Sequence, residues 1–268
     1  MPTLSKDTLL CISLAGRPSN LGTRFHNFLY DELGLDFVYK AFTTTDLEGA
    51  VRGVRALGIR GCSVSMPFKS AIIPFVDIVE DSAAAIEAVN TVVNDDGVLT
   101  AANTDVEAVT ELLDRERVPR DLRVAVRGSG SMAAAVTAAF RRAGFEAVTI
   151  VARDAAAGRT LADRTGYRWV AEPEPADLLV NVTPLGMAGR DADALAFDES
   201  LVRAARMLFD VVALPVETPL VRLARSAGLP VLTGAEVHAL QAALQFERYT
   251  GIRLTRDQID RASAFSRA

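Results

Sequence analysis

The sequence is short of the residue types that mark several protein classes. It has only two cysteines, Cys11 and Cys62, among 268 residues, which is too few for a disulfide framework. Both lie in apolar stretches, so we expect buried structural cysteines and a reducing, cytoplasmic setting. The two histidines, His26 and His238, lack metal-ligand spacing. We therefore predict no metal site.

The sequence also lacks a large excess of charge of one sign, and it lacks long apolar runs. The formal net charge is −5, which argues against a nucleic-acid partner held by bulk electrostatics. No apolar run approaches the roughly 20 residues that a membrane helix needs. The opening residues, MPTLSKDT, do not resemble a signal peptide, because no long apolar region follows a basic start. We therefore expect neither a membrane nor a nucleic acid as partner.

What the chain does have is enough apolar sequence for two α/β domains. Hydrophobic residues make up 50% of it, and segments with strand and helix periodicity alternate along its length. A break near residues 103–106 separates two such series. We predict an α/β fold with domains at 1–104 and 105–235, a cleft between them, and C-terminal helices at 236–268 that pack back on the first domain.

Local signals within the first series predict particular elements. Thr45 or Asp46 is a suitable N-cap for a helix over 44–58. The segments 68–77 and 81–90 have helical character. Asp96-Gly97 is the turn signal of a hairpin.

A glycine-rich turn opens the second series. In VAVRGSGSMAAAV an apolar strand runs into the G-x-G-x-x-A form of the dinucleotide fingerprint, made of Gly128, Ser129, Gly130, Ser131, Met132 and Ala133. Gly128 permits a tight turn, Gly130 lets backbone N–H groups approach a pyrophosphate, and Ala133 allows close helix packing. The helix N-terminus favours the phosphates. A plain strand–turn–helix is the alternative, but the context favours a Rossmann-type doubly wound dinucleotide domain.

The end of the next strand bears on which dinucleotide is bound. An NAD site needs an acidic residue there, whereas an arginine pairs with the 2′-phosphate of NADP. Here Arg153 comes first and Asp154 second. We predict NADP(H), with Arg159 as a helper. Asp154 keeps NAD open, and solvated arginines are the alternative.

Polar residues gather at predicted strand ends of the first domain. Lys69, Asn90, Asn103, Thr104 and Asp105 follow apolar strands or loops, where open α/β sheets bind ligands. An amide and a carboxylate both bind hydroxyl groups, and an enclosed lysine can accept a hydroxyl proton. The alternative is a surface lysine and an N-cap aspartate.

These motifs, in this order, resemble the shikimate dehydrogenase family along nearly the whole chain. The matching segments are GRPSNLGTRFHN, SVSMPFK, AVNTVVN with NTD, GSGSMA, NVTPLGM, DVVALPVETPL and LQAALQFERYTG. The resemblance implies an NADP-dependent oxidoreductase that acts on a CH–OH group and interconverts 3-dehydroshikimate and shikimate. It also implies a place in the chorismate pathway of aromatic amino acid biosynthesis.

The resemblance implies roles for individual residues too. Lys69 and Asp105 would form the catalytic pair. Substrate would be bound by Ser19, Asn20, Thr23, Ser65, Asn90 and Gln241. Beside the glycine loop, the cofactor would be bound by Arg153, Thr183, Gly186, Met187, Val211 and Gly234.

The sequence departs from the family at the carboxylate end of the substrate. The family's S-x-S pair is replaced by Asn20 and Gly22, and its tyrosine after the D-x-x strand by Ala213. In the N-V-T motif one hydroxyl survives, at Ser65. Two extra basic residues near the opening loop could hold a carboxylate instead: Arg17 and Arg24. This pattern indicates a shikimate dehydrogenase-like subclass.

Three alternatives to shikimate dehydrogenation stay open. One is a dehydrogenase for a related polyol acid such as quinate, and another is a dehydrogenase for an amino-polyol. The third is a non-catalytic nucleotide-binding regulator on the same fold. Retention of both Lys69 and Asp105 favours an enzyme. The partner is then a small cyclic polyol acid, and the protein a monomer or homodimer.

Overall fold

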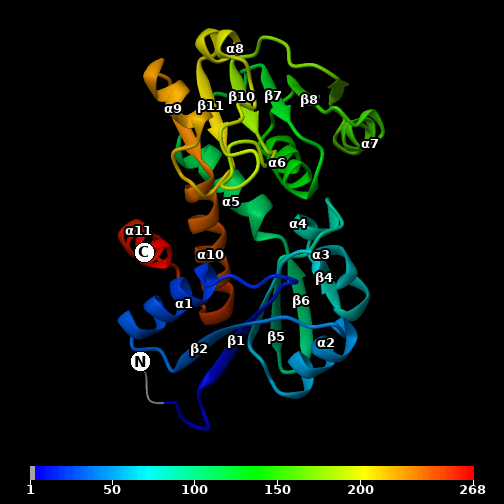
Figure 1. Cartoon of the computed structure of the whole chain (residues 1–268). Helices are drawn as coiled ribbons and strands as arrows, with labels where there is room; N and C mark the ends of the chain where they lie inside the picture. Colours follow the sequence, from blue (N-terminus) through cyan, green and yellow to red (C-terminus); the bar gives the residue numbers. More distant parts are fainter. Residues whose placement is uncertain (1–3) are drawn as a thin grey trace. The chain divides into compact units, whose positions relative to one another are not determined.

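The computed structural model describes residues 4–268, which form two compact units. Unit 1 comprises the chain up to Thr104 together with Ala239–Ala268, and unit 2 comprises Asp105–His238. Each unit contains one six-stranded sheet with helices packed on it (Figure 1). This arrangement confirms the predicted α/β fold class.

The sheet of unit 1 is mixed and has the strand order β2-β1-β3-β5-β6-β4. Parallel pairing joins β1 to β2 and to β3, whereas β5 runs antiparallel to β3 and to β6. This direction change brings the start of β5 to the carboxyl end of β3, with Thr91 opposite Ser63. The strands are β1 (Leu9–Leu14), β2 (Phe37–Phe42), β3 (Gly61–Val64), β4 (Ile78–Val79), β5 (Thr91–Asp95) and β6 (Val98–Ala102).

Helices cover both faces of this sheet. On one face, Phe25 and Tyr30 of α1 pack with Phe246 of α10 and with Cys11. On the other face, Val51 of α2 packs with Cys62 and its neighbours. The helices are α1 (Leu21–Glu32), α2 (Leu47–Ala56), α3 (Phe68–Ala71), α4 (Asp81–Ala84), α10 (Gly234–Thr250) and α11 (Arg256–Arg267), with a 3₁₀ turn, η1, at Ile73–Phe75.

The two cysteines are buried and free, as predicted. Burial raises the pKa of both the Cys11 and the Cys62 thiols to about 12. A thiol with so high a pKa is a poor nucleophile at neutral pH, so both act as apolar core residues.

The sheet of unit 2 is parallel throughout and has the order β12-β11-β10-β7-β8-β9. The chain builds outward from β7 to β9 and then returns to build from β10 to β12 on the other side. The strand order therefore reverses between β7 and β10, which is where doubly wound folds bind ligands. The strands are β7 (Val124–Arg127), β8 (Val148–Val151), β9 (Arg168–Val170), β10 (Leu178–Asn181), β11 (Met207–Asp210) and β12 (Val231–Thr233).

Alternate residues of these strands face two helical layers. Leu179 and Leu208 pack with Val202 of α8 and with Leu220 and Val221 of α9. The helices α6 and α7 pack against β7, β8 and β9. The helices are α5 (Thr104–Arg115), α6 (Ser131–Arg142), α7 (Ala155–Thr165), α8 (Glu199–Ala204) and α9 (Pro219–Ser226).

Several local predictions are confirmed, and two are wrong in extent. Asp46 caps α2 by accepting the Gly49 N–H at 2.8 Å, and Asp96 and Gly97 form the hairpin turn with φ of 50° and 93°. The predicted helix over 68–77 is only α3 followed by η1, because Pro74 cannot donate the hydrogen bond that a continued helix needs. The predicted helix over 81–90 stops after one turn, at Ala84.

Three short elements lie outside the predicted pattern: β4, β9 and α8. Two or three residues are too few for a strand period to show, and α8 has only one and a half turns. Within residues 4–268, none of the helices combines the length and the apolar character needed to cross a membrane.

Candidate functional site

The side chain of Asn90 organises the polar groups at one edge of the unit 1 sheet. Its Oδ1 accepts the Thr104 backbone N–H at 2.8 Å and the Thr91 hydroxyl at 2.8 Å, with the Thr104 hydroxyl at 3.1 Å. A backbone N–H can only donate, so this contact fixes which end of the amide is the oxygen. The Nδ2 end then donates toward Gln241 Oε1 at 3.5 Å. Asn90 is therefore held with its donor end beside Gln241.

A second glutamine on α10 completes this network. Gln245 is buried, and its Nε2 donates to the Thr91 hydroxyl at 3.0 Å and to the Asn90 carbonyl at 3.2 Å. Gln241 and Gln245 are four residues apart, so they share one face of the helix. Gln241 was predicted from the sequence as a substrate-binding residue, whereas Gln245 was not.

Lys69 is joined to Asn90 through the backbone. It lies half-buried in α3, two residues after Pro67, and its carbonyl accepts the N–H of Val89 at 2.8 Å. The strand before it ends at Val64, so Lys69 belongs to a short helix rather than to the strand end itself. Ser65, between the two, is exposed, and its backbone N–H donates to Leu14 at 2.9 Å.

Thr104 and Asp105 stand at the start of α5. Thr104 is fully buried and bound to Asn90 as described, and Asp105, the next residue, is 8% exposed. Asn103 is also buried, and its Nδ2 donates to the Ala88 carbonyl at 2.8 Å. Asn103 and Thr104 of the NTD motif are thus held by hydrogen bonds to Ala88 and Asn90.

The opening loop is less enclosed than this network. Ser19 and Asn20 are exposed and take no part in the hydrogen bonds around Asn90, and Asn20 precedes α1 without a side-chain cap bond. The Thr23 hydroxyl is buried and has no hydrogen-bond partner within residues 4–268. Arg24 stacks over the Phe265 ring, 5.0 Å from its centroid. Of the residues predicted to hold a substrate, the contacts bring together Asn90 and Gln241.

The glycine loop of unit 2 has the geometry of a dinucleotide cradle. Gly128 has φ of +132°, and a Cβ there would lie 2.7 Å from Val182 Cγ2, so only glycine fits. A Cβ at Gly130 would instead meet no atom within 4 Å. Open space over Gly130 is what a pyrophosphate lying against the backbone requires. Gly130 is the N-cap of α6, and Ala133 in its first turn is fully buried.

A pocket of about 780 Å³ opens over this loop. Five of the residues predicted to bind a cofactor line it: Gly128, Ser129, Gly130, Arg153 and Thr183. Seven others do not line it: Ser131, Met132, Ala133, Gly186, Met187, Val211 and Gly234. The pocket is also lined by Arg127, Glu172 and Asp191, which the sequence analysis missed.

A buried hydrogen-bond network supports the wall that carries Thr183. The Thr183 hydroxyl donates to Asn181 Oδ1 at 2.6 Å, and Asn181 Nδ2 donates to Asp210 Oδ1 at 3.0 Å. Asp210 Oδ2 accepts the Thr218 hydroxyl at 2.6 Å. Burial raises the pKa of the Asp210 carboxyl, because the charged form is desolvated. The network joins the carboxyl ends of β10 and β11 into one rigid edge.

The charged residues Arg153, Asp154 and Arg159, which follow β8, differ in whether they already contact other residues of the protein. The Asp154 carboxylate caps α7 by accepting the Ala157 N–H at 3.0 Å. Arg159 stacks on Trp169, 4.9 Å from the ring centroid. Arg153 is exposed and has no hydrogen bond or ion pair within the described part of the chain. Of these three residues, Arg153 is thus the one that is left available to a ligand.

Three predicted residues, Gly186, Met187 and Val211, lie on the neighbouring loops, and a fourth, Gly234, is the first residue of α10. Gly186, with φ of +87°, donates its N–H to the Asp191 carbonyl at 2.8 Å, and Met187 is 48% exposed. Val211 donates its N–H to the Asn181 carbonyl at 3.0 Å. Gly234 begins α10, where a Cβ would lie 2.1 Å from the Val211 carbonyl oxygen. Among residues 4–268 no three histidine, cysteine, aspartate or glutamate side chains are grouped as metal ligands.

Known proteins resemble the chain over its whole length. The family model for the shikimate dehydrogenase substrate binding domain matches residues 19–92. A shikimate dehydrogenase-like protein of Haemophilus influenzae is 52% identical over 267 residues, 98% of each chain. The NADP(+) shikimate dehydrogenase of Chlorobaculum tepidum is 35% identical over 257 residues, 87% of each chain.

Solved structures agree. A shikimate 5-dehydrogenase-like protein superposes with a TM-score of 0.97 at 52% identity, covering 99% of this chain and 100% of the other. Shikimate 5-dehydrogenase of Thermus thermophilus, in complex with NADP(H) and shikimate, gives 0.87 at 31% identity over 96% and 99% of the two chains. Quinate dehydrogenase of Corynebacterium glutamicum, in complex with NAD, gives 0.87 at 26% identity over 96% and 98%. The chain therefore belongs to the shikimate dehydrogenase family.

Proposed function

We propose that the protein is an NADP-dependent oxidoreductase that interconverts 3-dehydroshikimate and shikimate. The observation that carries the proposal is the fixed amide of Asn90. Its oxygen is occupied by Thr91 and Thr104, so its nitrogen is presented toward Gln241 as a donor for a ligand oxygen. A pair of amides beside a lysine suits a polyhydroxylated ring better than an apolar or phosphorylated ligand.

In this proposal each unit has one task. Unit 1 binds the polyol acid through Asn90 and Gln241, with Ser19, Asn20, Thr23 and Ser65 as further contacts. Unit 2 binds NADP(H), its diphosphate over Gly128–Gly130 and its 2′-phosphate at Arg153. The open space over Gly130 and the uncompensated charge of Arg153 support this assignment. A bound NADP(H) supplies or accepts the hydride.

The remaining chemistry is proton transfer, which we assign to Lys69. In the oxidation direction Lys69 takes the proton of the reacting hydroxyl, and in the reduction direction it returns the proton to the carbonyl oxygen. Asp105 orients Lys69 and the hydroxyl. The hydrogen bond from the Val89 N–H to the Lys69 carbonyl supports this role. It holds the Lys69 backbone against Val89, which is the residue directly before Asn90.

The test is NADP⁺ reduction with shikimate by the wild type, Lys69→Ala and Lys40→Ala. Lys40 is a matched control, since it lies on β2 of the same unit and its side chain stacks over Phe42. We expect Lys69→Ala to lower kcat by about 10²–10⁴-fold, the usual size of general acid–base catalysis, and Lys40→Ala to leave it unchanged. Equal rates for wild type and Lys69→Ala would refute the role of Lys69. No turnover of any cyclic polyol acid would refute the activity.

Quinate is a second candidate substrate. Asn20 and Gly22 replace the two serines that the family uses for the substrate carboxylate, and a quinate dehydrogenase is among the structural relatives. A comparison of kcat/KM for shikimate and quinate, each with NADP⁺ and NAD⁺, decides between them. A higher value for quinate would replace the first proposal with the second.

A further inference from the structure

Arg127 ends β7 and lines the unit 2 pocket directly beside the glycine loop. Its backbone pairs with Val151 on one side and with Asn181 on the other, and Gly128 follows it. An arginine at this place is not part of the glycine fingerprint, which specifies only the positions from Gly128 onward. The pocket therefore has a second arginine besides Arg153, next to the glycine loop, where a diphosphate would lie.

The guanidinium of Arg127 contacts the C-terminal end of a segment that forms one wall of the pocket. Its Nη1 donates to the Ala196 carbonyl, and the group lies over the Phe197 ring, 5.9 Å from the centroid. Phe197 is fully buried. The segment that ends there begins at Val182 and supplies Thr183 and Asp191 to the pocket. Arg127 thus ties both ends of this wall, residues 182–197, to the glycine-loop strand.

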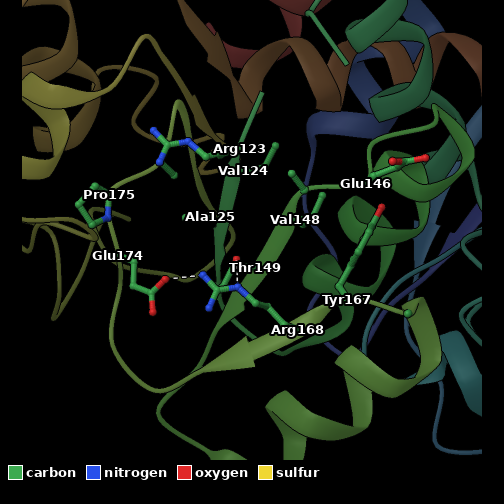
Figure 2. Close-up of a pocket in the computed structure, with 13 residues that line it drawn as sticks. Arg123, Val124, Ala125, Glu146, Val148, Thr149, Tyr167, Arg168, Glu174 and Pro175 are labelled. Carbon is green, nitrogen blue, oxygen red and sulfur yellow. Dashed lines mark hydrogen bonds and ion pairs between the residues drawn. The ribbon is translucent and has the colours of Figure 1, made fainter. Parts of the chain in front are cut away.

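The charge of Arg127 is uncompensated. Within the described chain no carboxylate lies within ion-pair distance of it, and its hydrogen-bond partner is a neutral carbonyl. Figure 2 shows the contrasting case in a second pocket, of about 400 Å³, at the amino ends of the same strands. There Arg168 pairs with Glu174, and Arg123 pairs with Asp177 at 3.0 Å. Charges already paired in this way leave little attraction for a ligand, so the pocket in Figure 2 makes a suitable control.

We propose that Arg127 is a cofactor-positioning residue that attracts the dinucleotide diphosphate and fixes the 182–197 wall around it. This inference rests on the proposed function, because it needs a dinucleotide in the unit 2 pocket. The glycine loop offers backbone N–H groups, and Arg127 adds a full positive charge beside them. Its effect falls on the part of the cofactor that NADP and NAD share, whereas the effect of Arg153 falls on the 2′-phosphate alone.

Calorimetric titration of NADP⁺ into the wild type, Arg127→Met, Arg127→Lys and Arg123→Met tests the proposal. Each titration is repeated over a series of salt concentrations, because salt screens an exposed charge contact and leaves a packing contact unchanged. We expect Arg127→Met to weaken binding by about tenfold to a hundredfold at low salt, and the deficit to shrink as salt is added. Arg127→Lys recovers part of the affinity, and Arg123→Met, at the other end of β7, binds like the wild type.

Each remaining outcome has a distinct meaning. Wild-type affinity in Arg127→Met overturns the inference and leaves the proposed function standing. A deficit that is equal at every salt concentration overturns the role of the charge and leaves only support of the wall. Absence of NADP⁺ and NAD⁺ binding by the wild type overturns the cofactor part of the proposed function itself. If Arg127→Met fails to fold, the decision rests on Arg127→Lys. An affinity and a salt dependence equal to those of the wild type in Arg127→Lys would contradict a role for the planar guanidinium that Ala196 holds.

Discussion

The parallel strands of unit 2 end at one edge of the sheet, the carboxyl edge, and begin at the opposite edge, the amino edge. The two edges carry similar residues but differ in what those residues are bound to. Arginines and acidic side chains line a pocket at each edge, one at the carboxyl ends of the strands and one at the amino ends (Figure 2). At the amino edge Arg123 and Arg168 are paired with Asp177 and Glu174. At the carboxyl edge Arg127 binds a neutral carbonyl, and Asp154 is engaged as a helix cap.

Charge alone does not identify a ligand site in this protein. Exposed ion pairs contribute little to stability, and a charge that is already paired attracts a third charge only weakly. Donors without a counter-charge, beside backbone that only glycine can form, remain available to an anion. We therefore propose the carboxyl edge as the ligand site, and variants at the two edges should differ in their effect on cofactor binding.

The largest effect is expected from Gly128→Ala. The new Cβ would lie 2.7 Å from Val182 Cγ2 at φ of +132°, so the loop must shift. We expect a loss of about 2–4 kcal/mol in the free energy of unfolding and a loss of NADP⁺ affinity of at least about a hundredfold. Urea unfolding and calorimetric titration measure the two quantities.

Gly166→Ala is the matched control at the amino edge. Gly166 has φ of +72°, but a Cβ there would meet nothing closer than the Arg141 Nη1 at 3.6 Å. We expect a cost of about 1–2 kcal/mol from the left-handed backbone and no change in affinity. A similar loss of affinity in both variants would mean that general destabilisation, and not the cradle, explains the result.

The next effect in size is expected from Arg153→Met, compared with Arg168→Met. Arg153 has no partner within residues 4–268, so its whole charge is free for a 2′-phosphate, whereas Arg168 is bound to Glu174 and to Thr149. We expect Arg153→Met to weaken NADP⁺ binding by about tenfold to a hundredfold and NAD⁺ binding little. Arg168→Met should leave both unchanged. An equal loss for both cofactors would show that Arg153 does not read the 2′-phosphate.

The features that sequence reasoning reached are those with a local rule behind them. The glycine loop was predictable because a positive φ beside a close neighbour permits only glycine, and Gly128 has both. The hairpin at Asp96-Gly97 and the cap at Asp46 follow from equally local chemistry. The two α/β units follow from apolar periodicity, which needs no knowledge of tertiary contacts.

What sequence reasoning missed depends on contacts between distant segments. Gln245 reaches Asn90 and Thr91 from more than 150 positions away, and nothing in its own neighbourhood distinguishes it from a helix-surface glutamine. Arg127 gains its place from Ala196 and Phe197, 69 and 70 positions on. The break of the predicted helix over 68–77, by contrast, was readable from Pro74 alone.

A smaller effect, in pH dependence, is expected from Asp210→Asn at the carboxyl edge. Burial raises the pKa of Asp210, so the folded protein favours its protonated form more than the unfolded chain does. The ionised carboxylate therefore weakens folding at neutral pH, and this penalty is lost as pH falls through the raised pKa toward the ordinary value of 3.8. We expect the wild type to gain stability relative to Asp210→Asn on acidification. Urea unfolding at several pH values measures this, and a wild type that loses stability relative to Asp210→Asn on acidification would contradict it.

The smallest effect, of opposite sign, is expected from Asp177→Asn at the amino edge. The hydrogen bond from the Arg123 side chain, with a second from its backbone N–H, lowers the pKa of the Asp177 carboxyl. Its stabilisation is therefore present above the unfolded value of 3.8 and is lost as pH falls through the lowered pKa. Because the Arg123 side chain of this pair is 65% exposed, we expect Asp177→Asn to lower Tm by only about 1–2 °C at neutral pH, and less in high salt. NADP⁺ affinity should not change. A loss of affinity in Asp177→Asn would show that the paired amino edge contributes to the site, and the comparison between the two edges would fail.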